Sequence, residues 1–148
     1  MNNKSEIFSE KINLSEKLSD DVYIRTNKED VVKAISELNV NPSEDFIQFY
    51  TLFAGPFWEE NMGIELLDFI DDHNNICSST YICRNEYGFD DKYLVLSEMN
   101  TSEVIVLDSE TDKVYRVNFE GGDELLKSGN LSEEWSSFIA FLKEYFNL

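Results

Sequence analysis

The chain has 148 residues, of which 42% are hydrophobic and 14% aromatic, and its 30 Asp and Glu against 12 Lys and Arg give a formal net charge of -18. This length suits one domain with a substantial core, and the aromatic content is too high for a disordered acidic tail. So strong a negative charge is a poor fit to the phosphate backbone of nucleic acids and to an anionic membrane surface.

The N-terminal part is expected to be mostly helical. Apolar residues among charges predict an amphipathic helix within residues 1–20, which either docks loosely on the body or frays. Residues 22–25 are a short strand candidate, and a second helix is expected over residues 27–38, because its apolar residues recur at helical intervals. The apolar residues that carry these two helices are Phe8, Ile12, Leu14, Leu18, Val31, Ile35 and Leu38.

The strongest local signals predict a helix that begins near Asn41 and ends near Gly55. Asn41 can cap it, Pro42 fits the first helical position, and Glu44 stands at the third. Gly55 can close the helix in the left-handed conformation, and Pro56 prevents it from continuing. The apolar face of this helix consists of Phe46, Phe49, Tyr50 and Phe53.

Beyond Pro56 the spacing of apolar residues becomes typical of strands. Strands are predicted at residues 63–69, 80–83, 92–97, 103–107 and 113–119, and residues 108–112 join the last two as a hairpin loop. Residues 104–107 are apolar on both faces, as expected of a central strand.

The chain is expected to end in a helix capped by Ser132, with Glu133 and Glu134 in the first turn, where the helix dipole favours anions. Helices at both ends of a run of strands predict an α+β fold, with a central antiparallel sheet of about five to six strands flanked by N-terminal and C-terminal helices. Residues 1–148 are interpreted as a single domain. The stripe that the last helix should bury is Trp135, Phe138, Ile139, Leu142 and Phe146.

Several of these segments resemble, in their order and spacing, the motifs of a known family. They are the proline-led helix after Asn39, the strand at residues 91–96, the hairpin at residues 104–115 and the closing helix at residues 131–146. The chain is thereby similar to SMI1/KNR4 domains of the SUKH superfamily over residues 27–146. The resemblance implies an immunity protein, because bacterial members commonly neutralise secreted polymorphic toxins, many of them nucleases. Eukaryotic relatives act instead as regulatory interaction proteins.

No residue pattern points to catalysis or to a metal site. His73 is the only histidine and lies in a polar stretch that is typical of a loop. Asp108, Glu110 and Asp112 have the spacing that begins a calcium loop, but Gly and Glu are missing from its sixth and twelfth positions. We therefore expect a protein that is not an enzyme and holds no cofactor or metal. A hydrolase that uses an acid pair with His73 remains the weaker alternative.

The sequence also bears on the compartment. It contains no apolar run of about 18 residues and does not begin like a secretion signal. Cys77 and Cys83 match no zinc spacing and are interpreted as reduced packing residues. A cytoplasmic protein is expected, without membrane contact, as a monomer or weak dimer.

The acids are distributed unevenly along the chain. Residues 34–83 contain no Lys or Arg, which predicts a negative surface that is not neutralised within the chain. Opposite potentials steer association, so such a surface suits a basic partner, although acidity can also serve only solubility. Trp58 is either an aromatic anchor of this surface or a cover of the core. The predicted partner-binding residues are Trp58, Glu59, Glu60, Asp68, Asp71, Asp72, Asp90 and Asp91.

These observations together predict an immunity protein that occludes the cationic active-site cleft of a cognate toxin, a nuclease by the family resemblance. The predicted partner is a basic toxin domain, with no direct contact to nucleic acid. The alternative is a regulatory adaptor or nucleic-acid mimic without a dedicated toxin.

Overall fold

A three-stranded antiparallel sheet lies at the centre of the fold in the computed structural model, which describes residues 4–99 and 102–148. Its strands are β1 (Tyr93–Val95), β2 (Glu103–Asp108) and β3 (Val114–Asn118), in the order β1-β2-β3. Leu94 pairs with Leu107, and Ile105 pairs with Arg116. The central position of β2 confirms the prediction from its apolar residues on both faces.

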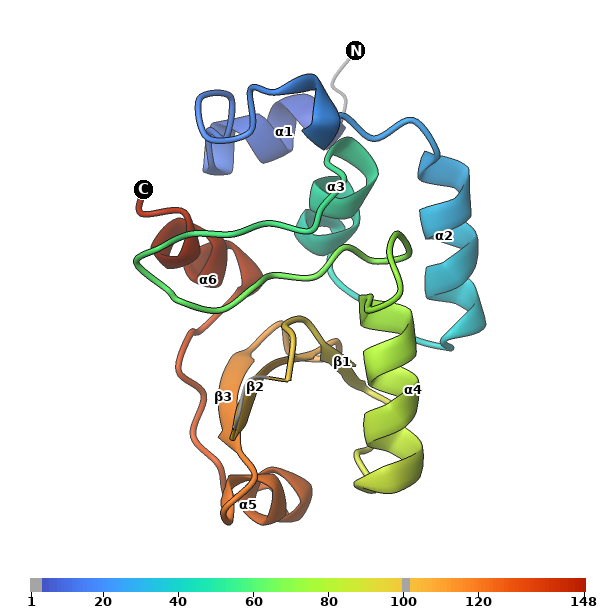
Figure 1. Ribbon diagram of the computed structural model, residues 1–148, viewed down its shortest axis with the longest axis vertical. Helices are drawn as coiled ribbons and strands as arrows, with labels where there is room; N and C mark the ends of the chain where they lie inside the picture. Colours follow the sequence, from blue (N-terminus) through green and yellow to red (C-terminus); the bar gives the residue numbers. More distant parts are fainter. Residues whose placement is uncertain (1–3, 100–101) are drawn as a thin grey trace.

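The helices surround this sheet (Figure 1). Both α3 and α6 lie at one end of it, α5 lies at the other end, and α4 packs against β1. On the far side of α3 from the sheet lies α1, and α2 packs beside α3. The helices are α1 (Lys4–Lys11), η1 (Asp21–Tyr23, a short 3-10 turn), α2 (Lys28–Glu37), α3 (Glu44–Leu52), α4 (Ile76–Glu86), α5 (Gly122–Ser128) and α6 (Phe138–Tyr145).

The α+β class is confirmed, but the expected five to six strands are more than the structure has. Residues 63–69 begin in a turn, where Gly63 is left-handed, and then make only isolated bridges, in which Leu66 faces Phe57 and Ser97. Residues 22–25 are not a strand: residues 22 and 23 end the turn η1, and Ile24 makes one bridge to Phe53. The prediction of a strand at residues 80–83 is wrong, because they lie inside α4.

Two helices are capped by residues that lie further along the chain than predicted. Ser43 caps α3, because its Oγ accepts a hydrogen bond from the Phe46 amide at 3.2 Å. Ser137, rather than Ser132, caps α6 in the same way through the Ala140 amide at 3.1 Å. Residues 131–137 are not helical but place Trp135 beside Val114 of β3.

The end of α3 differs from its prediction as well. The helix stops at Leu52, and Phe53 is already extended. Gly55 is not left-handed; it is instead held close to the ring of Phe57, where an added Cβ would lie 2.7 Å from a ring carbon. The requirement for glycine here therefore comes from the close approach of an aromatic side chain.

Apolar side chains on the two faces of the sheet belong to separate clusters. Leu94, Ile105 and Leu107 face the larger cluster, which also contains the aromatic residues of α3 and α6. Val95, Val104 and Val106 face the smaller one, with Cys83 of α4 and Leu126 of α5. This alternation is what a strand pattern of period two produces when both faces are covered.

The N-terminal segment is part of the larger cluster. Phe8, Ile12, Leu14 and Leu18 are all buried there. Lys11, at the end of α1, also pairs with Asp45 of α3 at 2.9 Å. Of the helices described in residues 4–99 and 102–148, none combines the length and the apolar character that crossing a membrane requires.

Candidate functional site

Asp68 lies in the interior and not on a binding surface, which corrects the expectation that it contacts a partner. Its side chain and that of Arg25 are both fully buried and form an ion pair. The carboxylate also accepts hydrogen bonds from the amides of Gly55 at 2.8 Å, Ile70 at 3.1 Å and Asp71 at 2.8 Å. Every buried charge needs such partners, so the role of Asp68 is to hold two loops together.

The other predicted residues lie at three separate places on the surface. The first is the long loop between α3 and α4, where it reaches toward α6 (Figure 1). Trp58 is 54% exposed there, while the neighbouring Phe57 occupies the core. Glu60 is exposed, and Glu59 is partly covered and pairs with Lys17 at 3.4 Å. Trp58 was expected either on the surface or as a cover of the core, and the structure places it on the surface.

The second place is the part of the same loop that leads into α4, on the opposite side of the molecule (Figure 1). Asp71 is half exposed, and its Oδ2 lies 3.4 Å from the guanidinium of Arg25. Asp72 is exposed in a left-handed conformation with a φ of 73°. His73 follows it and is exposed, as a loop histidine should be.

The third place is the turn between α4 and β1. Asp90 and Asp91 are exposed there, and the Lys92 amide donates to Asp90 at 3.0 Å. Asp91 lies 3.7 Å from the guanidinium of Arg84. These two acids border a polar depression of about 320 Å³ that the β2–β3 hairpin also lines, through Glu110.

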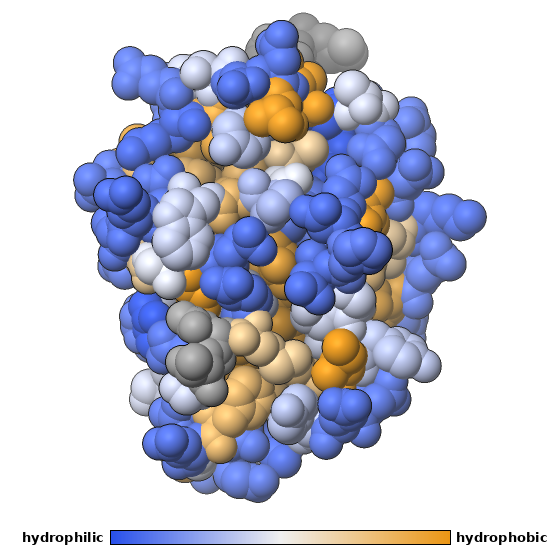
Figure 2. All heavy atoms as spheres, in the orientation of Figure 1, coloured by the Kyte–Doolittle hydropathy of each residue, from blue (hydrophilic) through white to orange (hydrophobic). Residues whose placement is uncertain are grey.

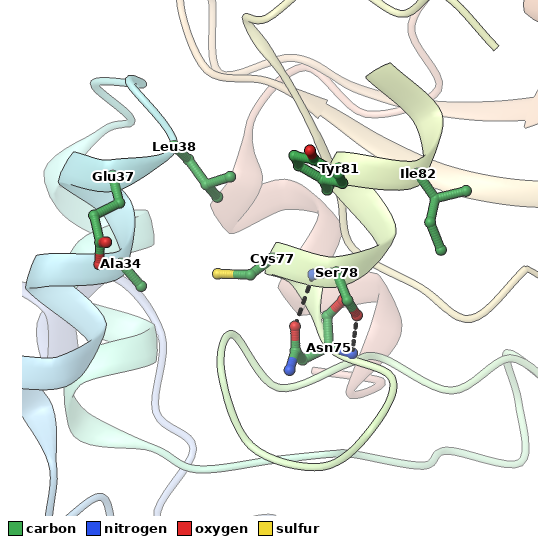
Figure 3. Close-up of a pocket in the computed structure, with 8 residues that line it drawn as sticks. All are labelled: Ala34, Glu37, Leu38, Asn75, Cys77, Ser78, Tyr81 and Ile82. Atoms are coloured by element: carbon green, nitrogen blue, oxygen red, sulfur yellow. Dashed lines mark hydrogen bonds between the residues drawn. The ribbon is translucent and has the colours of Figure 1, made fainter. Parts of the chain in front are cut away.

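A groove between α2 and α4, which was not expected from the sequence, forms an apolar depression of about 570 Å³ (Figure 3). Ala34 of α2 and Leu38, the residue that follows α2, line one side of it. Cys77 and Tyr81 line the other side from α4, with the Cys77 sulfur directed toward α2. Tyr81 is 66% exposed. The groove thus presents apolar side chains to solvent between two helices.

The groove was missed because α4 was mistaken for a strand. Its Thr-Tyr-Ile-Cys run is rich in β-branched and aromatic residues, which favour strands. A helical signal was nevertheless present, since the buried residues Ile76, Thr80 and Cys83 recur at spacings of four and three. Asn75 and Ser78 also form a capping box, with the Ser78 amide 2.8 Å from the Asn75 side chain.

The residues that were considered as possible calcium or zinc ligands lie in the β2–β3 hairpin or in α4. Asp108 to Asp112 form the predicted hairpin loop, in which the Asp112 amide donates to the Asp108 carbonyl at 2.8 Å. No group of three or more His, Cys, Asp and Glu side chains is arranged to hold a metal ion in residues 4–99 and 102–148. Both cysteines are free thiols, and burial raises the pKa of Cys77 to about 11 and that of Cys83 to about 12.

Hydrophilic residues cover most of the molecular face in Figure 2, and apolar ones reach it only in patches. A search of curated proteins finds no match to the chain. The family model described as SMI1 / KNR4 family (SUKH-1), in contrast, matches residues 25–144. This match covers most of the chain and includes every strand, so the protein belongs to the SMI1/KNR4 (SUKH-1) family.

Proposed function

We propose that this protein is an immunity protein, which binds a cognate secreted toxin and blocks its active site. The observation that carries the proposal is the excess of acids on the surface of a folded SUKH-1 domain, with a formal net charge of -18. Most of the basic side chains already take part in ion pairs, such as Lys11 with Asp45 and Arg116 with Glu134. The surplus of negative charge is therefore available to a partner.

The proposed mechanism is occlusion. A toxin that acts on nucleic acid needs a cationic cleft, since it must bind phosphates. An acidic protein surface is attracted to such a cleft and excludes the substrate without any covalent step. The candidate contact residues lie at three separate places on the surface, so one cleft would cover only some of them. They are Trp58, Glu59, Glu60, Asp71, Asp72, Asp90 and Asp91, without the buried Asp68.

The test is a calorimetric titration of this protein against the toxin domain encoded beside its gene, at two salt concentrations. We expect tight one-to-one binding that weakens as salt rises, together with loss of toxin activity in the complex. Binding to several unrelated basic proteins without such a toxin would support the regulatory adaptor instead. Absence of binding to the toxin would contradict the immunity proposal.

A further inference from the structure

Neither helix beside the α2–α4 groove fills it, because each packs on a different part of the fold. Val31 and Ile35 of α2 are buried toward α3. Thr80 of α4 faces β1, where its Oγ1 accepts a hydrogen bond from the Val95 amide at 2.9 Å. The sides of the helices that face each other are therefore left open. Ala34, Leu38 and Cys77 on these sides are partly covered by the larger core cluster. Their remaining apolar surface stays in water, which is unfavourable unless another molecule covers it.

The exposed side of α4 adds to this apolar surface. Tyr81 is 66% exposed and Ile82 is 40% exposed, and both line the groove. Neither belongs to the two clusters of the core. An exposed Tyr beside an aliphatic residue in a concave site is typical of positions that dominate binding energy at protein interfaces.

The charges at the rim indicate what kind of molecule fits. Glu37 lies in the wall of the groove, and the Asn75 side chain at its other end donates to the Asp72 carbonyl at 3.1 Å. Exposed Asp72 is thus next to the groove. Lys33 precedes Glu37 by one helical turn, so these side chains together leave a net negative rim.

Arg84 does not neutralise this rim, because it is engaged elsewhere. Its guanidinium donates to the Leu38 carbonyl at 3.0 Å and to the Asp91 carbonyl at 2.6 Å. These bonds tie the end of α2 to the turn after α4.

We propose that the α2–α4 groove is the primary docking site for a segment of the partner that carries large apolar side chains flanked by Lys or Arg. The inference rests on the proposed function. It assigns most of the energy of toxin binding to this groove and not to the loop around Trp58. In this arrangement the apolar side chains fill the space between Leu38 and Tyr81. The cations of the segment lie against Glu37 and Asp72.

The volume of about 570 Å³ also falls in the range of small-molecule sites, roughly 300–1,000 Å³. Such sites place a few polar groups to orient the ligand. Here the polar side chains of Asn75 and Ser78 are already engaged in the helix cap, because each accepts a hydrogen bond from the backbone amide of the other, at 2.8 Å for Asn75 and 3.1 Å for Ser78. This favours side chains of a protein partner as the occupant.

The first experiment compares two double variants in binding to the cognate toxin domain. Tyr81→Ser/Ile82→Ser removes exposed apolar groups from the groove. The matched control, Val22→Ser/Leu125→Ser, removes exposed apolar groups of η1 and α5. We expect the groove variant to weaken binding by about tenfold or more and the control to stay within about twofold of the original protein. Circular dichroism and a thermal melt of each variant verify that it is folded.

The second experiment uses Cys77 as a reporter of occupancy. Cys77 lines the groove, whereas Cys83 is fully buried and serves as an internal control. Alkylation by iodoacetamide at about pH 9, where some thiolate is present, should label Cys77 and leave Cys83 unlabelled. Bound toxin should slow Cys77 labelling by about tenfold or more, as expected for a site covered by a tight complex.

The outcomes of these experiments distinguish an error in the groove assignment from an error in the immunity proposal. Full toxin binding by the groove variant, or Cys77 labelling that the toxin does not slow, would overturn the groove assignment and leave the immunity proposal intact. Failure of the original protein to bind the toxin would contradict the immunity proposal. The groove is then tested with a helical peptide of Leu and Lys, which should protect Cys77 where a Leu and Glu peptide does not. Equal protection by both peptides would overturn the proposed charge preference, and protection by neither would overturn the docking site.

Discussion

The guanidinium of Arg25 and the carboxylate of Asp68 form an ion pair with both side chains fully buried. Arg25 also donates through Nε to the Tyr50 carbonyl at 3.0 Å and through a terminal nitrogen to the Phe53 carbonyl at 3.2 Å. Asp68 accepts from the amide of Gly55 on the other side. The pair therefore joins the segment before α2, the end of α3 and the loop that leads to α4.

Asp68→Ala is expected to lower the free energy of unfolding by about 3–5 kcal/mol, because it leaves the Arg25 charge buried without its partner. Urea denaturation at neutral pH measures the change. The matched control is Glu60→Ala, at an exposed position earlier in the same loop, which should change stability by about 0.5 kcal/mol or less. A loss at Asp68 as small as that of the control would contradict the structural role.

This buried pair could not be predicted from the sequence. Asp68 was grouped with its neighbours because acids crowd the region and no Lys or Arg lies within residues 34–83. Its partner, Arg25, is 43 residues away, and only the fold brings the two together. A charge pattern along the chain shows which residues lack a local counter-charge but cannot show distant pairing.

The elements that were predicted well had strong local signals. The aromatic helix at residues 44–52, the central strand and the hairpin at residues 108–112 follow from caps, periodicity and turn residues. The strand expected at residues 80–83 failed because its β propensity was overridden by contacts with the sheet, which Thr80 makes through Val95. No strand forms over residues 63–69, because Gly63 is left-handed in a turn and only Leu66 has bridge partners.

Tyr145→Phe is expected to destabilise the protein by about 1–3 kcal/mol, since it removes the hydroxyl that donates to the buried Ile64 carbonyl. The Tyr145 hydroxyl lies 2.8 Å from the Ile64 carbonyl and 3.0 Å from the Phe57 carbonyl, and it accepts from the Leu66 amide at 3.2 Å. It thereby links α6 to the loop that carries Trp58. Urea denaturation measures the loss, and hydrogen exchange of the Leu66 amide should accelerate. Tyr81→Phe, at an exposed hydroxyl, is the control and should leave both quantities unchanged.

Stability is expected to fall at alkaline pH because buried tyrosines must ionise on unfolding. Burial raises the pKa of Tyr145 and of Tyr50 above their usual value in unfolded chains. The folded state therefore holds these protons more tightly, and their contribution is complete below about pH 10 and is lost as pH rises through the folded pKa. Each tyrosine should lower the free energy of unfolding by about 1.4 kcal/mol per pH unit above pH 10.

Urea denaturation from about pH 8 to pH 11 tests this dependence, with absorbance at 295 nm to follow tyrosinate. The slope above pH 10 should be reduced in Tyr145→Phe, which has one buried phenol fewer, and unchanged in Tyr81→Phe. A stability that stays flat to pH 11 would mean that these phenols ionise as easily in the folded protein as in the unfolded chain.

Neutralising acids at the rim of the groove should affect partner binding more than neutralising an equal charge elsewhere. Glu37→Gln/Asp72→Asn and Asp90→Asn/Asp91→Asn each remove two negative charges from exposed positions, so they change the net charge equally. The first pair should slow association with the toxin domain several-fold at low salt and flatten its salt dependence, because rim charges act mainly on the association rate. The second pair should have a smaller effect, since its position after α4 is outside the groove.

Stopped-flow measurements at two or more ionic strengths give both quantities for each variant. Equal slowing by the two variants would show that only the net charge of the protein steers the encounter, and that no acidic site is preferred. A larger effect of Asp90→Asn/Asp91→Asn would instead place the cationic surface of the toxin at the β2–β3 hairpin, where the polar depression lies. The comparison therefore locates the encounter surface by the difference between two variants of the same charge.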